Sequence, residues 1–205
     1  MRLHHLVLTT AALALAAAPA AAQGGLALIP KIGAFAPLSD LGEAEGSVQE
    51  LEGSLAVGLA AEVGLPVLPF DLRAGFDYAT DTKVSSEGLG EEGSADEVTL
   101  LALTADAVFR RDTGGLLQPY LLLGGGIKRY DISREEVQAG DPDVILDEDE
   151  SDVTGHLGLG LGLGLGLLTV TAEISDYISQ FEGTDGESEL QNDLYLMVGA
   201  RVGLF

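Results

Sequence analysis

The sequence predicts an all-β fold: an eight-stranded antiparallel up-and-down transmembrane β-barrel with short periplasmic turns and long acidic extracellular loops. Three observations carry this prediction. Apolar residues recur at every second position in eight segments, short and long connections alternate between those segments, and the acidic residues concentrate in the long connections. The 205 residues include 33 Asp and Glu against 10 Lys and Arg, yet 46% of them are hydrophobic. Charged and apolar residues must therefore lie in separate parts of the chain.

The composition also excludes several classes of protein. Cysteine is absent, so disulfide frameworks, thiolate metal sites and cysteine nucleophiles are excluded together. A net charge of −23 argues against nucleic acid as a partner, because phosphate binding requires a cationic face. No motif for a cofactor occurs, and we expect none to bind.

The first 22 residues predict export. Arg2 opens the chain, an apolar run follows from Leu6 to Ala18, and small residues up to Ala22 precede Gln23. That order is typical of a cleaved secretory signal peptide. A membrane anchor is the alternative, but the leucine-rich part is too short to cross the roughly 30 Å of a hydrocarbon core. We therefore expect a signal peptide at 1–22 and an outer-membrane β-barrel domain at 23–205.

The strands are predicted from their alternation. The clearest segment is 153–165, VTGHLGLGLGLGL, in which leucine and glycine exchange at successive positions. Glycine weakens a strand in a soluble core, but the narrow interior of a small barrel must accommodate side chains from every strand. A spanning strand needs about 9–11 residues. The remaining predicted strands are 25–37, 54–65, 70–78, 97–110, 116–131, 167–181 and 194–204.

The connections predict the orientation. Those at 66–68, at 111–115 and around Gly166 are short, whereas those at 38–52, 82–96, 132–151 and 182–190 are long and acidic. Outer-membrane barrels have short periplasmic turns and longer outer loops. An even number of strands then leaves both termini on the periplasmic side.

The whole predicted mature chain resembles the superfamily of small eight-stranded outer-membrane β-barrels, the porin family that includes the outer-membrane protein A barrel and the outer-membrane protein W family. The features that carry the resemblance are the signal peptide, the segments Pro30–Phe35 and Pro119–Gly126, and the terminal Phe205. The resemblance implies that Phe205 is the C-terminal signal read by the barrel-assembly machinery. It also implies the outer membrane of a Gram-negative-type bacterium as the location, reached through the periplasm. The expected partners are outer-membrane lipid and lipopolysaccharide, and the export and assembly machinery; the oligomeric state is left open.

Charged residues at inward positions predict ion pairs inside the barrel, because an unpaired buried charge is costly. The short 66–68 turn should bring Glu62 close to Arg73. A loop centred near residue 187 should place Glu173 opposite Arg201. Such pairs form either a gate, with a cation-selective constriction, or a plug of structural salt bridges, and we favour the plug. Further inward polar residues are Lys31, Asp77, Asp106, Lys128 and His156, with Asp71 at the rim.

No catalytic residue is predicted. His156 is the one histidine left after cleavage, and it shares its face with the glycines that point into the barrel. Lipid A deacylases carry a serine two residues after such a histidine, whereas Gly158 stands there in this chain. A lipid-modifying enzyme is therefore the least favoured alternative.

No metal site is predicted either. Asp141, Asp143, Asp147 and Asp149 are clustered, and carboxylates can chelate Ca²⁺ or Mg²⁺. Their spacing matches no calcium loop, however, and a solvated acidic loop is the favoured interpretation.

The sequence thus predicts a non-enzymatic integral outer-membrane protein of the small-porin class, a surface scaffold. Its lumen should be largely filled, because an eight-stranded interior is just wide enough for side chains. The alternative is a narrow channel for small solutes, including hydrophobic ones.

Overall fold

The computed structural model describes residues 25–38, 42–44, 47–51, 53–87, 97–111, 113, 115–133, 150–166, 168–182 and 188–204. Three predicted features lie outside these described residues: the signal peptide at 1–22, the acidic group Asp141, Asp143, Asp147 and Asp149, and the terminal Phe205.

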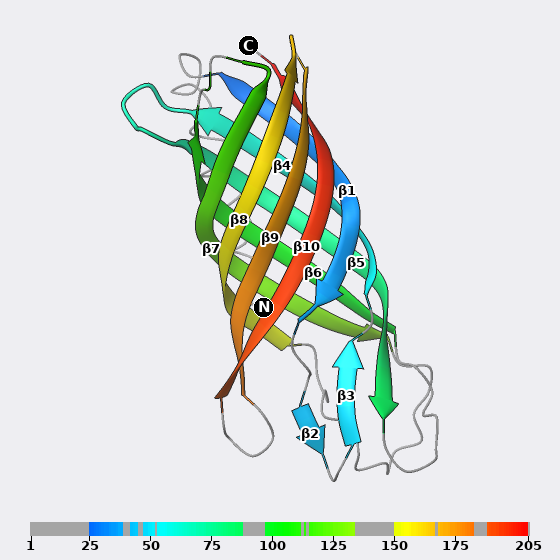
Figure 1. Ribbon diagram of the computed structural model, residues 1–205. Coiled ribbons are helices and arrows are strands. Elements are labelled where there is room, and N and C mark those ends of the chain that lie inside the picture. Colours follow the sequence, from blue (N-terminus) through cyan, green and yellow to red (C-terminus); the bar gives the residue numbers. More distant parts are fainter. Residues whose placement is uncertain are drawn as a thin grey trace.

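Eight long strands wind around one axis (Figure 1). They are β1 (Leu26–Pro37), β4 (Ser54–Gly64), β5 (Asp71–Glu87), β6 (Glu97–Arg110), β7 (Leu117–Ser133), β8 (Glu150–Leu165), β9 (Leu168–Glu182) and β10 (Ser188–Gly203). Two short strands, β2 (Gly42–Ala44) and β3 (Ser47–Leu51), precede β4. No helix long and apolar enough to cross a membrane occurs in the described part of the chain.

The barrel is closed and antiparallel. Each long strand pairs with the next one along the chain, and β1 pairs with both β4 and β10, so that Lys31 lies opposite Gly58 on one side and Gly199 on the other. Closure leaves no free edge among the eight strands, and every ladder of backbone hydrogen bonds is completed within the wall. The predicted closed, antiparallel, eight-stranded barrel is confirmed.

The outward face is apolar throughout the middle of the barrel. On β8 the outward leucines from Leu157 to Leu165 are between 39% and 60% exposed, while the inward side chains of Thr154 and His156 on the same strand are buried. A soluble barrel would carry polar residues on this face, whereas a spanning barrel needs a band of hydrocarbon-facing side chains. We call this surface the outer wall. It continues on the other strands through residues that include Ile32, Leu59, Phe76, Leu123, Ile174, Leu196 and Val198.

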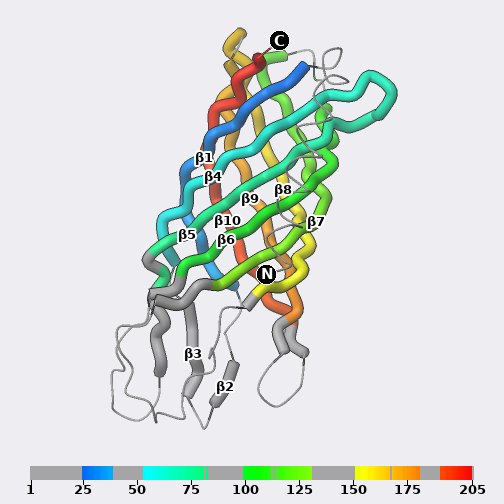
Figure 2. The backbone as a smooth tube through the Cα atoms, turned by 180° about the vertical axis from the view of Figure 1, so that it is seen from behind, coloured from blue at the N-terminus to red at the C-terminus, as the bar shows by residue number. Residues whose placement is uncertain are grey.

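One end of the barrel carries the short turns. Figure 1 shows the β4–β5 and β8–β9 turns at the same end as the end of β10, and Figure 2 shows this end from behind. Backbone hydrogen bonds from Gly64 to Gly25 and from Leu204 to Leu26 hold the ends of β4, β1 and β10 together there. The β8–β9 turn depends on Gly166, which has a φ of 79°, in the left-handed region that glycine adopts without strain.

The strands extend further at the opposite end than the alternation predicts. β5 continues to Glu87, beyond the end at residue 78 that the alternation predicted. The alternation stops earlier than the strand because a register shift between Ala79 and Thr82 inserts an extra residue. β2 and β3 form a hairpin inside the connection predicted at 38–52, and β3 pairs with β5, with Val48 opposite Glu87. Outside a bilayer, backbone pairing can continue without an apolar outward face, so periodicity alone does not reveal these segments.

Candidate functional site

The candidate site is the polar interior of the barrel. Near the short-turn end, the fully buried Glu62 of β4 binds three guanidinium groups from three other strands. Its Oε2 accepts from Arg73 Nη2 at 2.9 Å, and its Oε1 accepts from Arg110 Nη2 at 2.6 Å and from Arg201 Nε at 2.9 Å. We call these four residues the Glu62 cluster. They join β4, β5, β6 and β10 through one carboxylate.

The Glu62 cluster continues toward the middle of the lumen. Arg73 Nη1 also donates to Glu173 Oε2 at 2.6 Å, and Lys31 Nζ lies 3.5 Å from Glu173 Oε1. Lys31 donates in turn to Asp77 Oδ2 at 3.0 Å, and Asp77 also accepts a hydrogen bond from the Tyr177 hydroxyl. These ion pairs cross the lumen in several directions, and all of the residues involved are buried.

The pairings correct one prediction from the sequence. Glu62 and Arg73 lie opposite each other, as the short turn requires. The predicted pair between Glu173 and Arg201 is wrong, since Glu173 lies opposite Met197 and binds Arg73 and Lys31. The pairing of β9 with β10 places Ser188 opposite Glu182, a register that differs from the one expected for a loop centred near residue 187. That shift moves Arg201 to a position opposite Thr169, from which it reaches Glu62 instead.

A second group of polar residues lies toward the long-loop end. The fully buried Lys128 donates to Asp193 Oδ2 at 2.5 Å, and its Nζ lies 4.9 Å from the centre of the Tyr130 ring. The Tyr130 hydroxyl lies 2.9 Å from the same Asp193 oxygen and 2.8 Å from Gln191 Oε1. The sequence analysis identified Lys128 as an inward residue but did not identify its partner Asp193.

Aromatic rings fill the lumen between the two groups. The Tyr177 ring lies 4.9 Å from that of Tyr195, centre to centre, and Tyr195 lies 5.2 Å from Phe35. The imidazole of His156 stacks on Tyr177 at 4.4 Å. His156 Nδ1 lies 2.7 Å from Asp106 Oδ1, so the partner of the predicted lumen acid Asp106 is a histidine.

Three glycines allow these polar contacts to form. Each glycine lies on the strand between two polar residues, directly paired with both, and the two polar side chains meet above it. The three sets are Lys31–Gly58–Asp77, Asp106–Gly124–His156 and Tyr120–Gly160–Glu173. We call Gly58, Gly124 and Gly160 the bridging glycines.

A side chain at a bridging glycine would displace the polar group that crosses it. A Cβ on Gly58 or Gly124 would overlap the carboxylate of Asp77 or Asp106, and a Cβ on Gly160 would overlap the ring of Tyr120, which donates to Glu173 at 3.0 Å. The alternation of leucine and glycine predicted a narrow interior. It did not predict which glycines separate interacting residues, because that depends on the register of three strands.

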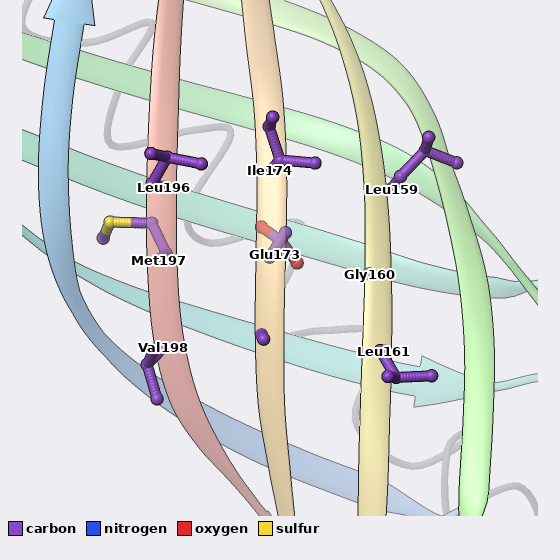
Figure 3. Close-up of a pocket in the computed structure, with 9 residues that line it drawn as sticks. Leu159, Gly160, Leu161, Glu173, Ile174, Leu196, Met197 and Val198 are labelled. Carbon is purple, nitrogen blue, oxygen red and sulfur yellow. The ribbon is translucent and has the colours of Figure 1, made fainter.

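A depression also occurs on the outer wall, over β8, β9 and β10 (Figure 3). Its volume is about 490 Å³. The larger side chains of Leu159, Leu161, Leu196 and Val198 surround it on the neighbouring strands. Gly160, Glu173 and Met197 also line it, and the carboxylate of Glu173 is bound to Arg73 in the lumen. Within the described residues no three acidic or histidine side chains are grouped as a metal site would require.

No family model and no curated protein matches the sequence. Solved structures match in fold. Neisserial surface protein A has a TM-score of 0.62 at 12% identity, covering 87% of this chain and 96% of that one. The outer membrane protein OprG from Pseudomonas aeruginosa has a TM-score of 0.54 at 13% identity, covering 88% and 94%. Ail, the attachment invasion locus protein of Yersinia pestis, has a TM-score of 0.52 at 15% identity, covering 88% and 99%.

These likenesses concern the fold, and they agree with the closed wall of eight strands and with its apolar outward face. A band of exposed leucine and valine around a closed antiparallel barrel is what a spanning barrel requires. The chain therefore has the closed eight-stranded antiparallel β-barrel fold of these outer-membrane proteins.

Proposed function

We propose that the protein is a non-enzymatic scaffold of the outer membrane, with a lumen sealed by side chains and with acidic loops displayed outside the cell. The observation that carries the proposal is the Glu62 cluster and its continuation through Glu173 and Lys31 to Asp77. Ion pairs from six strands cross the lumen there, and the interior of an eight-stranded barrel is just wide enough for side chains to fill.

A buried ion-pair network of this kind favours a plug over a gate. Removing one partner of a buried pair leaves an uncompensated charge at a cost of several kcal/mol. In the Glu62 cluster, one carboxylate forms ion pairs with three arginines. Opening a continuous path through the lumen would therefore separate several ion pairs at once. The packed rings of Phe35, Tyr177 and Tyr195 form a second obstruction in the lumen. Separating the ion pairs would not remove this obstruction.

Surface display is supported by the distribution of charge and by the names of two similar proteins. The long connections carry most of the acidic residues, and the chain has a net charge of −23. One similar structure is called a surface protein and another an attachment invasion locus protein. The partners we propose are the surrounding lipid and lipopolysaccharide and the machinery that exports and assembles the barrel.

Conductance across a planar bilayer tests the proposal. The purified protein should give no resolvable current steps, and a variant that breaks the plug, Glu62→Ala with Arg73→Ala, should give them. Arg111→Gln is the matched control, because this exposed arginine lies in a turn outside the cluster. Regular current steps from the unmodified protein would contradict the sealed scaffold and support the narrow channel instead.

The enzyme alternative is not favoured, because the serine on the strand beside the histidine is not accessible. Ser175, on the strand next to His156, is 2% exposed, and His156 is 3% exposed. A lipid ester could not reach them through the filled lumen. The proposal therefore expects identical outer-membrane lipid composition in cells that express the unmodified chain and in cells that express His156→Gln.

A further inference from the structure

Arg110 of β6 and Arg201 of β10 meet at the short-turn end of the lumen. Arg110 Nη2 and Arg201 Nε donate to the same atom, Glu62 Oε1, at 2.6 Å and 2.9 Å. The two guanidinium groups therefore converge, although their strands are not neighbours in the wall. Both side chains can be reached from outside the barrel, because that of Arg110 is 18% exposed and that of Arg201 is 27% exposed.

The third arginine of the Glu62 cluster is well supplied with negative charge. Arg73 binds Glu62 and Glu173, and it lies opposite Asp106 in the ladder of β5 with β6. Its side chain is 2% exposed. Arg73 therefore lies deeper in the lumen and has carboxylates on more than one side.

Arg110 and Arg201 have fewer carboxylates than Arg73. Arg110 has one besides Glu62, since its Nε lies 3.7 Å from Asp71 Oδ2. Among the described residues, Glu62 is the one carboxylate that forms an ion pair with Arg201. The two guanidinium groups nearest the mouth of the lumen thus share one carboxylate oxygen, which balances their positive charge incompletely.

One donor of Arg110 is left over. Its Nη2 is bound to Glu62, its Nε faces Asp71, and the carbon of its guanidinium group lies 5.1 Å from the centre of the Tyr120 ring. Its Nη1 is buried and has no hydrogen-bond partner in the protein. A buried donor of a charged group is costly to leave unpaired, and such a donor points to a bound acceptor such as water or an ion.

The lumen has room for an acceptor beside Arg201. In one row across β10, β9 and β8, Arg201 lies opposite Thr169, and Thr169 lies opposite Gly164. A Cβ on Gly164 would meet nothing closer than the side-chain nitrogen of Gln118, at 3.5 Å. β8 therefore brings no side chain to this row, and the residues on the two strands beside it carry uncharged donor groups.

We propose that Arg110 and Arg201 form a binding site for a phosphate group at the short-turn mouth of the lumen. A planar guanidinium group presents pairs of N–H donors that match the oxygens of phosphate. Arg110 supplies Nη1, and Arg201 supplies its terminal nitrogens, because it binds Glu62 through Nε. The bound anion completes the charge balance that Glu62 leaves incomplete. The site does not depend on whether the lumen conducts.

Nitrogen NMR of the arginine side chains tests this binding directly. The protein, expressed in full with labelled arginine and folded in a detergent without phosphate, is titrated at neutral pH with inorganic phosphate or with sodium chloride of equal ionic strength. Phosphate should shift two guanidinium signals in a saturable way, and chloride should not. The signals are assigned by their loss in Arg110→Lys and Arg201→Lys. The absence of a saturable shift, or an equal shift with chloride, would overturn the proposal.

Substitution separates a built site from general attraction of anions. Arg110→Gln and Arg201→Gln each remove one charged donor, so the dissociation constant for phosphate should rise by roughly tenfold or more. Arg201→Lys keeps the charge without the planar group and should also bind more weakly. Arg111→Gln is the matched control, because it removes the same charge from an exposed residue next to Arg110 in the chain. Unboiled gels establish that each variant is folded. Equal affinities in Arg201→Gln and Arg111→Gln would show that phosphate responds to net charge alone.

The same signals distinguish two sources of the phosphate group. A free ion should shift them in detergent and in vesicles, and only after phosphate is added. A lipid headgroup should shift them in vesicles of phosphatidylglycerol without added phosphate, and should reduce the response to phosphate added later. Either pattern supports the site, whereas unchanged signals in both media would contradict it.

Discussion

Gly160 provides a sharp test of the packing inside the barrel. It is the bridging glycine between Tyr120 on β7 and Glu173 on β9, and an added Cβ would overlap the Tyr120 ring. In Gly160→Ala, the ring must leave its place. Its hydroxyl then loses the hydrogen bond to the buried carboxylate of Glu173.

The expected loss of stability follows from two contributions. A buried hydrogen bond to a charged group contributes roughly 1.5–3 kcal/mol. Overpacking an interior that must shift to accept a methyl group costs about 1–3 kcal/mol. The free energy of unfolding should therefore fall by about 2.5–6 kcal/mol, which corresponds to a change in the unfolding equilibrium of roughly 60- to 20,000-fold.

Urea titration of the protein in lipid vesicles, read by the mobility of unboiled samples, measures this change. Gly164→Ala is the control on the same strand, because its Cβ would lie 3.5 Å from Gln118 Nε2, an ordinary contact. Exchange of glycine for alanine in a strand is otherwise favourable by about 0.5–1 kcal/mol, so the control should be as stable as the unmodified protein or slightly more so. Equal urea midpoints for the two variants would refute the assignment of Gly160 as a position that must lack a side chain.

Three further substitutions test the interior and the outer wall, each by the same urea titration. Glu62→Gln leaves three arginines without their shared carboxylate and should cost about 3–5 kcal/mol, a loss that a purely peripheral role of Glu62 would not produce. Leu159→Arg places a charge on the hydrocarbon-facing side of β8 and should cost about 2–4 kcal/mol, and an unchanged midpoint would argue against a membrane-facing wall. Asp176→Leu removes the outward carboxylate next to Leu157 and Leu194 and should add about 1 kcal/mol, whereas a loss of stability would indicate that Asp176 has a partner in the bilayer.

Alternation in the sequence predicted the eight strands and the sides on which their residues lie, because the two faces of a spanning strand meet different surroundings. It also predicted that Glu62 meets Arg73, since a short turn leaves the register little freedom. The pairing of Glu173 was predicted wrongly, because a long acidic connection does not show where its hairpin turns, and a small shift of the turn changes the partner.

The pairs that cross a bridging glycine could not be predicted from one hairpin. Asp106 meets His156 through the combined registers of β6 with β7 and of β7 with β8. Each register adds its own uncertainty, and the connection between β7 and β8 is the longest one in the sequence. The short hairpin of β2 and β3 was missed for another reason, since it lies in a polar segment without an apolar period.

Arg201 lies on the last strand, and its carboxylate partner Glu62 lies on β4, beyond the seam where β1 meets β10. Lys31 on β1 and Glu173 on β9 form a second link across the same seam. A truncated product that stops before β10 therefore has two defects, an incomplete set of counter-ions and two bare strand edges. Arg201 follows Glu62, Arg73 and Arg110 along the chain, so the Glu62 cluster can be completed only after β10 has been made.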